Sequence, residues 1–273
     1  QRQMCIRDSF HGSPLLSHVT FINNIASGGA GGGLMLSNDG SNIINPVISY
    51  SRFISNTSML GGGMMNIGGS ATINHSIFSN NTAQAGGAAY TTSTETYSHV
   101  TFSGNIAIAG SVIASETNTI TINNSIIWGN PGSSLFNGNP TIQHTLVQDG
   151  YPGVGNLSAD PLFVDAAGAD MVPGTVDDDL RLRSASPALN AGSAALIPAD
   201  TSDEDGDGDT SEPAPLDLDG SSRVVGAVDL GPYERQITLI GPELATATYG
   251  SAYTHTFNAQ VDCHWRRPKP PAF

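Results

Sequence analysis

An acidic stretch near residue 205 carries the side chains of this 273-residue sequence that best suit metal chemistry. Its carboxylates alternate with glycines and end on a glutamate: Asp203, Asp205, Asp207, Asp209 and Glu212. Alternating carboxylates suit Ca²⁺, which takes roughly 6–8 oxygen ligands, and the glycines allow the loop to wrap around an ion. A solvated acidic loop without an ion is the equal alternative. We therefore predict Ca²⁺ as the one candidate cofactor.

A second set of candidate ligands lies three residues before a recurring apolar position. Its members are His18, Tyr50, His75, His99, Asn124 and His144. Imidazoles on adjacent strands could bind a transition metal, and a row of rings could stack on sugars. Strand alternation places these side chains opposite the apolar position, so we expect them to face solvent. We favour a polar outer face over a ligand site.

Ionisable residues are scarce in the first 150 residues, which argues against catalysis there. Residues 10–150 hold only four acids and one arginine, with no lysine: Asp39, Glu95, Glu116, Asp149 and Arg52. Acid–base cleavage of polysaccharides needs clustered carboxylates or a carboxylate with a nearby base. Glu95 and Glu116 could approach one another, yet the sequence offers no third group beside them. We predict no catalytic residues.

The elements that must position these groups follow from a repeat. Phenylalanine recurs with asparagine three residues later, as Phe21/Asn24, Phe53/Asn56, Phe78/Asn81 and Phe102/Asn105, and Ile127/Asn130 continues the series. Successive anchors are 32, 25, 24 and 25 residues apart, and glycine clusters follow the first four asparagines. A unit of about 25 residues with three short strand-like runs predicts one turn of a parallel β-helix. A β-sandwich, the competing fold, requires no fixed period.

In such a solenoid, neighbouring turns lie about 4.8 Å apart and equivalent residues stack. We expect the four phenylalanines to point inward and pack on one another. We expect the five asparagines to sit at a corner, where they tolerate left-handed φ and form a hydrogen-bonded ladder.

Charge and composition exclude other classes of protein. Only 12% of residues are charged, against about 25% in ordinary domains, and the formal net charge is −14. Nucleic-acid binding needs clustered basic residues, and the sole lysine is Lys269. The sequence has no run of 18 apolar residues, so it predicts no transmembrane helix.

The two ends differ from the rest of the sequence. Residues 1–9 (QRQMCIRDS) resemble a translated sequencing adapter, and we interpret them as an artefact, with a genuine strand as the alternative. Residues 263–273 turn basic and proline-rich, which we interpret as a frameshift or a second artefact. The only cysteines, Cys5 and Cys263, lie in these ends, so we expect no disulfide framework.

Two family resemblances extend this interpretation. FINN, FISN, FSNN and FSGN, followed by GGG or GGA, resemble the repeats of chlamydial-type polymorphic outer-membrane proteins and, more broadly, of the pectate-lyase-like superfamily. The resemblance implies an all-β, right-handed parallel β-helix, which we place at residues 10–158. Residues 159–235 contain DPLF, SPALNAG and DLGPYE in order, which is similar to choice-of-anchor Q bacterial surface proteins.

We expect residues 159–235 to form an irregular C-terminal cap that covers the open end of the solenoid. Residues 236–262 resemble the first strands of an immunoglobulin-like module, truncated here and poorly ordered. The acidic loop resembles the start of an EF-hand loop, but Ala214 stands where the bidentate glutamate belongs.

These observations favour a non-enzymatic, exported or cell-surface bacterial protein that is monomeric. Its expected role is adhesion, or contact with an extracellular polysaccharide or surface glycan. A fragment of a polysaccharide lyase or glycoside hydrolase whose catalytic coils are missing is the alternative. A purely structural spacer is the third possibility.

Overall fold

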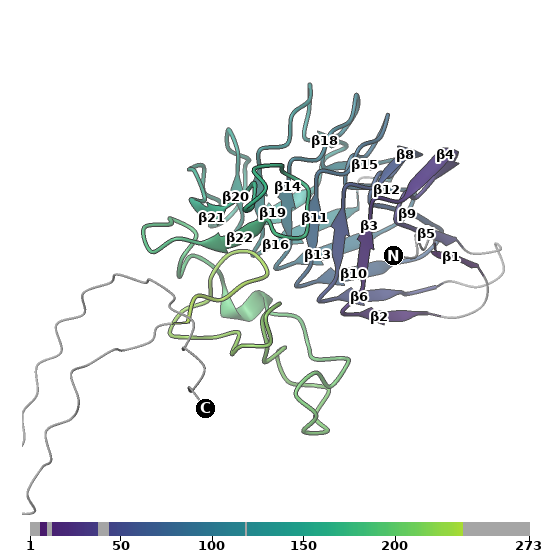
Figure 1. The fold of residues 1–273 in the computed structure, drawn as a ribbon. Coiled ribbons are helices and arrows are strands. Elements are labelled where there is room, and N and C mark those ends of the chain that lie inside the picture. The colour runs from purple at the N-terminus through teal and green to yellow at the C-terminus, as the bar shows by residue number, and fades with distance from the viewer. Residues whose placement is uncertain (1–5, 10–12, 38–43, 118, 237–273) are drawn as a thin grey trace, which may run out of the picture. The chain divides into compact units, whose positions relative to one another are not determined.

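The computed structural model describes residues 6–9, 13–37, 44–117 and 119–236. Its regular structure is almost entirely β, and three sheets of parallel strands dominate it (Figure 1). The predicted immunoglobulin-like start (236–262) and the C-terminal artefact (263–273) lie outside the described residues, apart from Gln236.

Each of the three sheets has six strands. Sheet 1 consists of β1 (Ile6–Ser9), β5 (Leu34–Ser37), β9 (Met64–Ile67), β12 (Ala89–Thr91), β15 (Ile113–Ser115) and β18 (Phe136–Asn137). Sheet 2 consists of β2 (Leu15–Ser17), β6 (Val47–Ser49), β10 (Ala71–Asn74), β13 (Glu95–Ser98), β16 (Ile120–Asn123) and β19 (Thr141–Gln143). Sheet 3 consists of β3 (Thr20–Ile22), β7 (Arg52–Ile54), β11 (Ile77–Ser79), β14 (Thr101–Ser103), β17 (Ile126–Trp128) and β20 (Leu146–Val147).

The chain visits the three sheets in turn, so each repeat adds one strand to every sheet. A short parallel pair, β4 (Ile25–Ala30) with β8 (Thr57–Leu60), lies between sheets 3 and 1 along the chain. We call residues 15–147 the strand stack. This long stack of parallel strands is consistent with the parallel β-helix that the repeat predicts.

The core of the strand stack contains the repeated phenylalanines. The register aligns Phe21 with Phe53, Phe53 with Phe78, and Phe78 with Phe102. Their ring centroids lie 4.8, 4.5 and 5.4 Å apart in successive pairs, and all four rings are buried. Each ring therefore covers the next, because one repeat alone cannot bury its apolar side chains.

The corners of the strand stack use left-handed backbone at fixed positions. At the corner that follows sheet 3, the left-handed residue is the one directly before each ladder asparagine: Asn23, Ser55, Asn80, Gly104 and Gly129. The ladder asparagines themselves therefore do not have the left-handed φ that we expected of them. Close approach imposes glycine elsewhere: a Cβ on Gly62 would lie 2.4 Å from the carbonyl oxygen of Gly87. The glycine clusters thus let one repeat lie directly on the next.

Residues 148–158 cover the end of the strand stack at β18–β20. Tyr151 packs edge-on against Phe136, and Leu157 pairs with Leu146. The Asn156 side chain accepts a hydrogen bond from the Thr145 amide and donates to the Ile142 carbonyl.

Residues 159–235, which we call the flanking segment, lie along the side of the strand stack rather than over its end, contrary to our expectation. Leu180, Leu218 and Tyr233 pack against Tyr50 and Ile77. Further along, Leu182, Ala188 and Leu230 pack on Ile126 and Leu146. The physical reason is that three outward side chains of sheet 3, Ile77, Ile126 and Leu146, are apolar and need cover on this side as well.

The flanking segment has little regular structure of its own. It contains the antiparallel pair β21 (Phe163–Asp165) and β22 (Asp179–Leu182) and the 3₁₀ turn η1 (Ala194–Leu196). At the other end, β1 pairs with β5 in parallel, so part of the predicted adapter forms a strand. Its interpretation as an artefact stays a prediction.

Candidate functional site

The five predicted corner asparagines form one continuous hydrogen-bonded row inside the strand stack. Each Nδ2 donates to the Oδ1 of the next asparagine, at 2.9, 3.0, 2.9 and 3.0 Å from Asn24 to Asn130. Asn56, Asn81 and Asn105 also donate from their backbone amides to the same oxygens. All five side chains are buried, so this row stabilises the repeat and offers no surface for a ligand.

The predicted metal loop brings two groups of carboxylates together. Asp203, Asp205 and Asp207 place ligand oxygens within 4.8 Å of one another, and so do Asp200, Asp205 and Glu212. Asp205 belongs to both groups, and three hard oxygen donors suit a divalent cation. This acidic cluster could hold a metal ion.

Two residues of the loop differ from the sequence expectation. Asp209 joins neither group, because its Oδ1 accepts hydrogen bonds from the Ser211 amide and hydroxyl. Asp200 was missed because it precedes the Asp–Gly alternation. It is buried and accepts a hydrogen bond from the Glu204 amide. Burial and the neighbouring aspartates raise the pKa of Glu212, as expected where like charges converge.

The candidate ring ligands form a column at the corner between sheets 2 and 3. His18, Tyr50, His75 and His99 stack at centroid separations of 5.1, 5.0 and 4.9 Å, with planes within 8° of parallel. All four, and Asn124 and His144 after them, have left-handed φ. We call this set the ring column.

The middle of the ring column is buried and is not the solvated outer face that strand alternation predicts, whereas the His18 side chain at its first position is 61% exposed, as predicted. His75 and His99 are fully buried, and the flanking segment covers them. The Tyr50 hydroxyl donates to the Leu216 carbonyl at 3.3 Å, and Asn124 exchanges hydrogen bonds with Ser193. Strand alternation fails here because left-handed corner residues lie outside the strands and do not follow their period.

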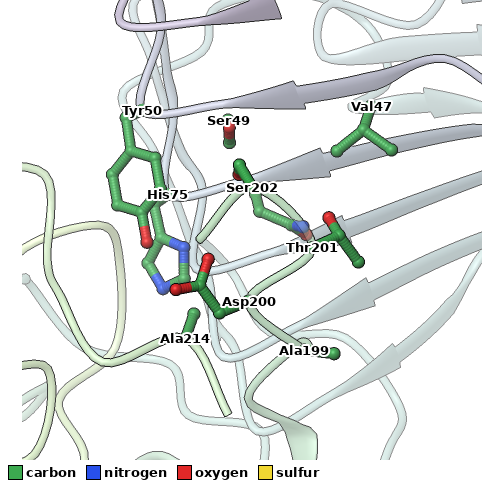
Figure 2. Close-up of a pocket in the computed structure, with 10 residues that line it drawn as sticks. Val47, Ser49, Tyr50, His75, Ala199, Asp200, Thr201, Ser202 and Ala214 are labelled. Atoms are coloured by element: carbon green, nitrogen blue, oxygen red, sulfur yellow. The ribbon is translucent and has the colours of Figure 1, made fainter. Parts of the chain in front are cut away.

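A small cavity lies between the ring column and the flanking segment. Val47, Tyr50, His75 and Asn74 line one side, and Asp200 and Ser202 line the other, with the Asp200 carboxylate beside the His75 ring (Figure 2). Its volume of about 10 Å³ matches one water molecule. The cavity therefore has no room for an organic substrate.

Comparison with protein-family models and with curated proteins finds no match to this chain. Among the described residues, no helix has the length and apolar character needed to cross a membrane. A function for this chain therefore has to be inferred from its sequence and from the geometry of its side chains.

The ionisable groups considered for catalysis point in different directions. Glu95 is buried inside the strand stack, where the Tyr97 hydroxyl donates to its Oε2 at 2.6 Å. Glu116 is exposed and accepts a hydrogen bond from Tyr90 on the outer surface. The Arg52 guanidinium donates to the Tyr233 hydroxyl of the flanking segment. Glu95 therefore faces the interior and Glu116 the outer surface, so the structure does not gather these groups in one site.

The buried Glu95 makes the stability of the protein pH-dependent. Burial raises its pKa from 4.5 to about 7, although the hydrogen bond from Tyr97 acts in the opposite direction. The folded chain thus holds a proton that the unfolded chain releases above pH 4.5, and the stability this confers is lost as the pH rises through 7. The expected loss is about 3 kcal/mol between pH 4.5 and pH 7.

Urea unfolding of wild type and Glu95→Gln across this range measures that effect. The variant should lack this part of the pH dependence, because glutamine keeps the shape and cannot ionise. Glu116→Gln, at an exposed carboxylate, should follow the wild type. Equal slopes for wild type and Glu95→Gln would contradict the expectation.

Proposed function

We propose that the strand stack is a right-handed parallel β-helix within an exported or cell-surface protein of the choice-of-anchor Q type. Its role is non-enzymatic contact with a neutral extracellular polysaccharide. The observation that carries this proposal is an uncharged, hydroxyl-rich column on the outer face of sheet 2. The register stacks Thr72, Thr96, Thr121 and Thr141 in successive strands.

This column faces outward because the strand alternates. Ile73, Tyr97 and Ile122 belong to the core, so the threonine beside each points the other way. Thr141 is exposed and the other three are partly exposed. Thr94 and Thr119 add an exposed second column, with a hydrogen bond between their hydroxyls at 3.2 Å.

The chemistry of the face favours a neutral partner. The outward residues of sheet 2 are apolar, hydroxyl or amide side chains, although the chain carries a net charge of −14. An anionic glycan would be repelled by that net charge. Hydroxyl rows repeating at about 4.8 Å offer donors and acceptors to a sugar chain without desolvating an ion.

Affinity electrophoresis of the full chain in gels that contain neutral or anionic polysaccharides tests this proposal. Neutral polysaccharide should retard wild type, and the double variant Thr96→Glu/Thr121→Glu should bind at least roughly tenfold less tightly, because it forces carboxylates into the contact. The matched control is Thr57→Glu/Thr82→Glu, since these threonines also pair in register but lie outside sheet 2.

Two results would reject this function. New reducing ends or unsaturated products would favour the enzyme fragment. Equal migration in all gels would favour the structural spacer.

The cation suited to the acidic cluster is Ca²⁺, because flexible loops with many carboxylate oxygens match its large coordination number. Ca²⁺ at 100 times its Kd should stabilise the protein by about 2.7 kcal/mol. Asp205→Asn should abolish this gain, since Asp205 serves both carboxylate groups.

Calorimetric titration and thermal unfolding with Ca²⁺ or EDTA measure the effect. Asp209→Asn is the matched control and should keep the gain, because Asp209 belongs to neither group. If the wild type binds no Ca²⁺, the acidic cluster is a solvated loop without a bound ion.

A further inference from the structure

His99 lies at the point where the strand stack meets the flanking segment. It is fully buried and stacks on His75, and its other neighbour in the ring column is Asn124. Two groups of the flanking segment influence the pKa of His99: the positive charge of the Arg223 guanidinium lowers it, and the backbone of Gly231 raises it. Arg223 Nη2 lies 3.3 Å from Glu234 Oε2 in an ion pair. The negative charges of Asp217 and Asp229 also stabilise the charged form of this guanidinium.

Hydrogen bonds from the flanking segment fix the orientation of the Asn124 amide. The Ser193 amide donates to Asn124 Oδ1 at 2.8 Å, and Asn124 Nδ2 donates to the Ser193 carbonyl at 2.9 Å. The same Nδ2 lies 3.1 Å from His99 Nε2. Since an amide NH₂ can only donate, His99 Nε2 must accept, which requires a neutral imidazole at this atom.

An imidazolium at position 99 is incompatible with these contacts. Both of its ring nitrogens would carry hydrogens, so Nε2–H would point at the Asn124 NH₂. Turning the amide to accept that hydrogen would break both bonds to Ser193. Burial, Arg223 and His75 all lower the pKa of His99, and only the Gly231 backbone opposes them.

We propose that His99, Asn124 and Ser193 form an acid-labile latch, in which a proton on His99 releases the flanking segment from the strand stack while the strand stack stays folded. The latch uses no residue of the acidic cluster. It stands independently of the proposed polysaccharide contact, since sheet 2 need not change when the segment opens.

The direction and size of the effect follow from proton linkage. The latched state holds His99 neutral, whereas the open state titrates near the ordinary histidine pKa of about 6.5. Opening therefore becomes easier as the pH falls below about 6.5. One proton should raise the opening equilibrium roughly 30-fold between pH 7.5 and pH 5.0.

Hydrogen exchange of the full chain at these two pH values, corrected for chemical exchange rates, tests the latch. The amides of Ser193 and Gly231 report opening, because both donate to Asn124. We expect their protection to fall roughly 30-fold more in the wild type than in His99→Asn. Asparagine suits the site because Asn124 has the same left-handed corner in the next repeat.

Three comparisons make the result decisive. His144→Asn, at the same corner but without the Ser193 contact, should keep the wild-type pH dependence. Core strand amides such as Phe102 should stay protected at pH 5.0, and their loss together with the flanking amides would overturn a local latch. Equal pH dependence in wild type and His99→Asn would also overturn it.

A titration of the unmodified protein gives a second, independent check. The Cε1–H signal of His99, assigned by its absence in His99→Asn, should remain that of a neutral ring below about pH 6.5, the ordinary histidine pKa. A His99 that titrates near pH 6.5 without loss of Ser193 protection would reject the latch.

Discussion

Replacement of Arg223 by methionine is expected to lower the free energy of unfolding by about 3–5 kcal/mol at pH 8, as for other buried ion pairs that lose one partner. Arg223 is fully buried in the flanking segment. Its guanidinium donates to the carbonyls of Gly231 and Asp229 at 3.1 and 2.6 Å and lies 3.3 Å from the Glu234 carboxylate. Methionine retains much of the volume but removes the buried guanidinium charge that faces the carboxylates of Glu234, Asp217 and Asp229.

The loss should shrink in acid, because the stranded carboxylates can then take up protons. Asp217, Asp229 and Glu234 are all buried, and burial raises the pKa of each, that of Glu234 to about 7. Arg223 opposes this rise at Asp229 and Glu234. Without Arg223 these groups are driven toward the neutral form, so the variant should be relatively more stable at pH 5 than at pH 8.

Urea unfolding of both proteins at the two pH values measures this difference. Arg181→Met is the matched control: Arg181 makes a two-contact pair with Asp219 but is half exposed. Solvent screens that pair, so its removal should cost less than about 1 kcal/mol. Equal losses of unfolding free energy in the two variants would show that the buried ion-pair network stabilises the protein no more than an exposed pair does.

The repeated part of the fold could be predicted because its cause is local and periodic. Phe53 and Phe78 bury their rings only if successive repeats align, so the sequence period determines the strand register. The asparagine row follows from the same alignment, since Asn56 and Asn81 must meet once the phenylalanines do. The alternation of Asp203, Asp205 and Asp207 likewise places three carboxylates on one loop without long-range information.

The contacts of the flanking segment could not be predicted, because they join residues far apart in the chain. His75 is buried by a segment that begins more than eighty residues later, and no period connects them. A weak signal existed in the apolar pairs Ile77–Phe78 and Ile126–Ile127, where both faces of a sheet 3 strand need cover. Asp200 was missed for a similar reason, since only the fold of the loop returns it to Asp205 and Glu212.

Replacement of Asn81 by alanine is expected to cost about 4 kcal/mol, because it breaks the asparagine row at its middle. The Asn81 Oδ1 accepts hydrogen bonds from the backbone amide and Nδ2 of Asn56, and its Nδ2 donates to Phe53 and Asn105. Alanine leaves several of these buried groups without partners, and each such group costs about 1–3 kcal/mol. Water cannot replace them, since the site is fully buried.

Asn80→Gly is the control that separates the ladder from the corner. Asn80 adjoins Asn81 but is only half-buried and takes the left-handed position, where the next two repeats have Gly104 and Gly129. Glycine relieves the strain of that φ, so the change should stay within about 1 kcal/mol. Denaturant unfolding of both variants at one pH decides between two origins of stability. A large loss of stability only in Asn81→Ala would show that the stability comes from the buried hydrogen bonds. Similar losses in both variants would show that it comes from the turn.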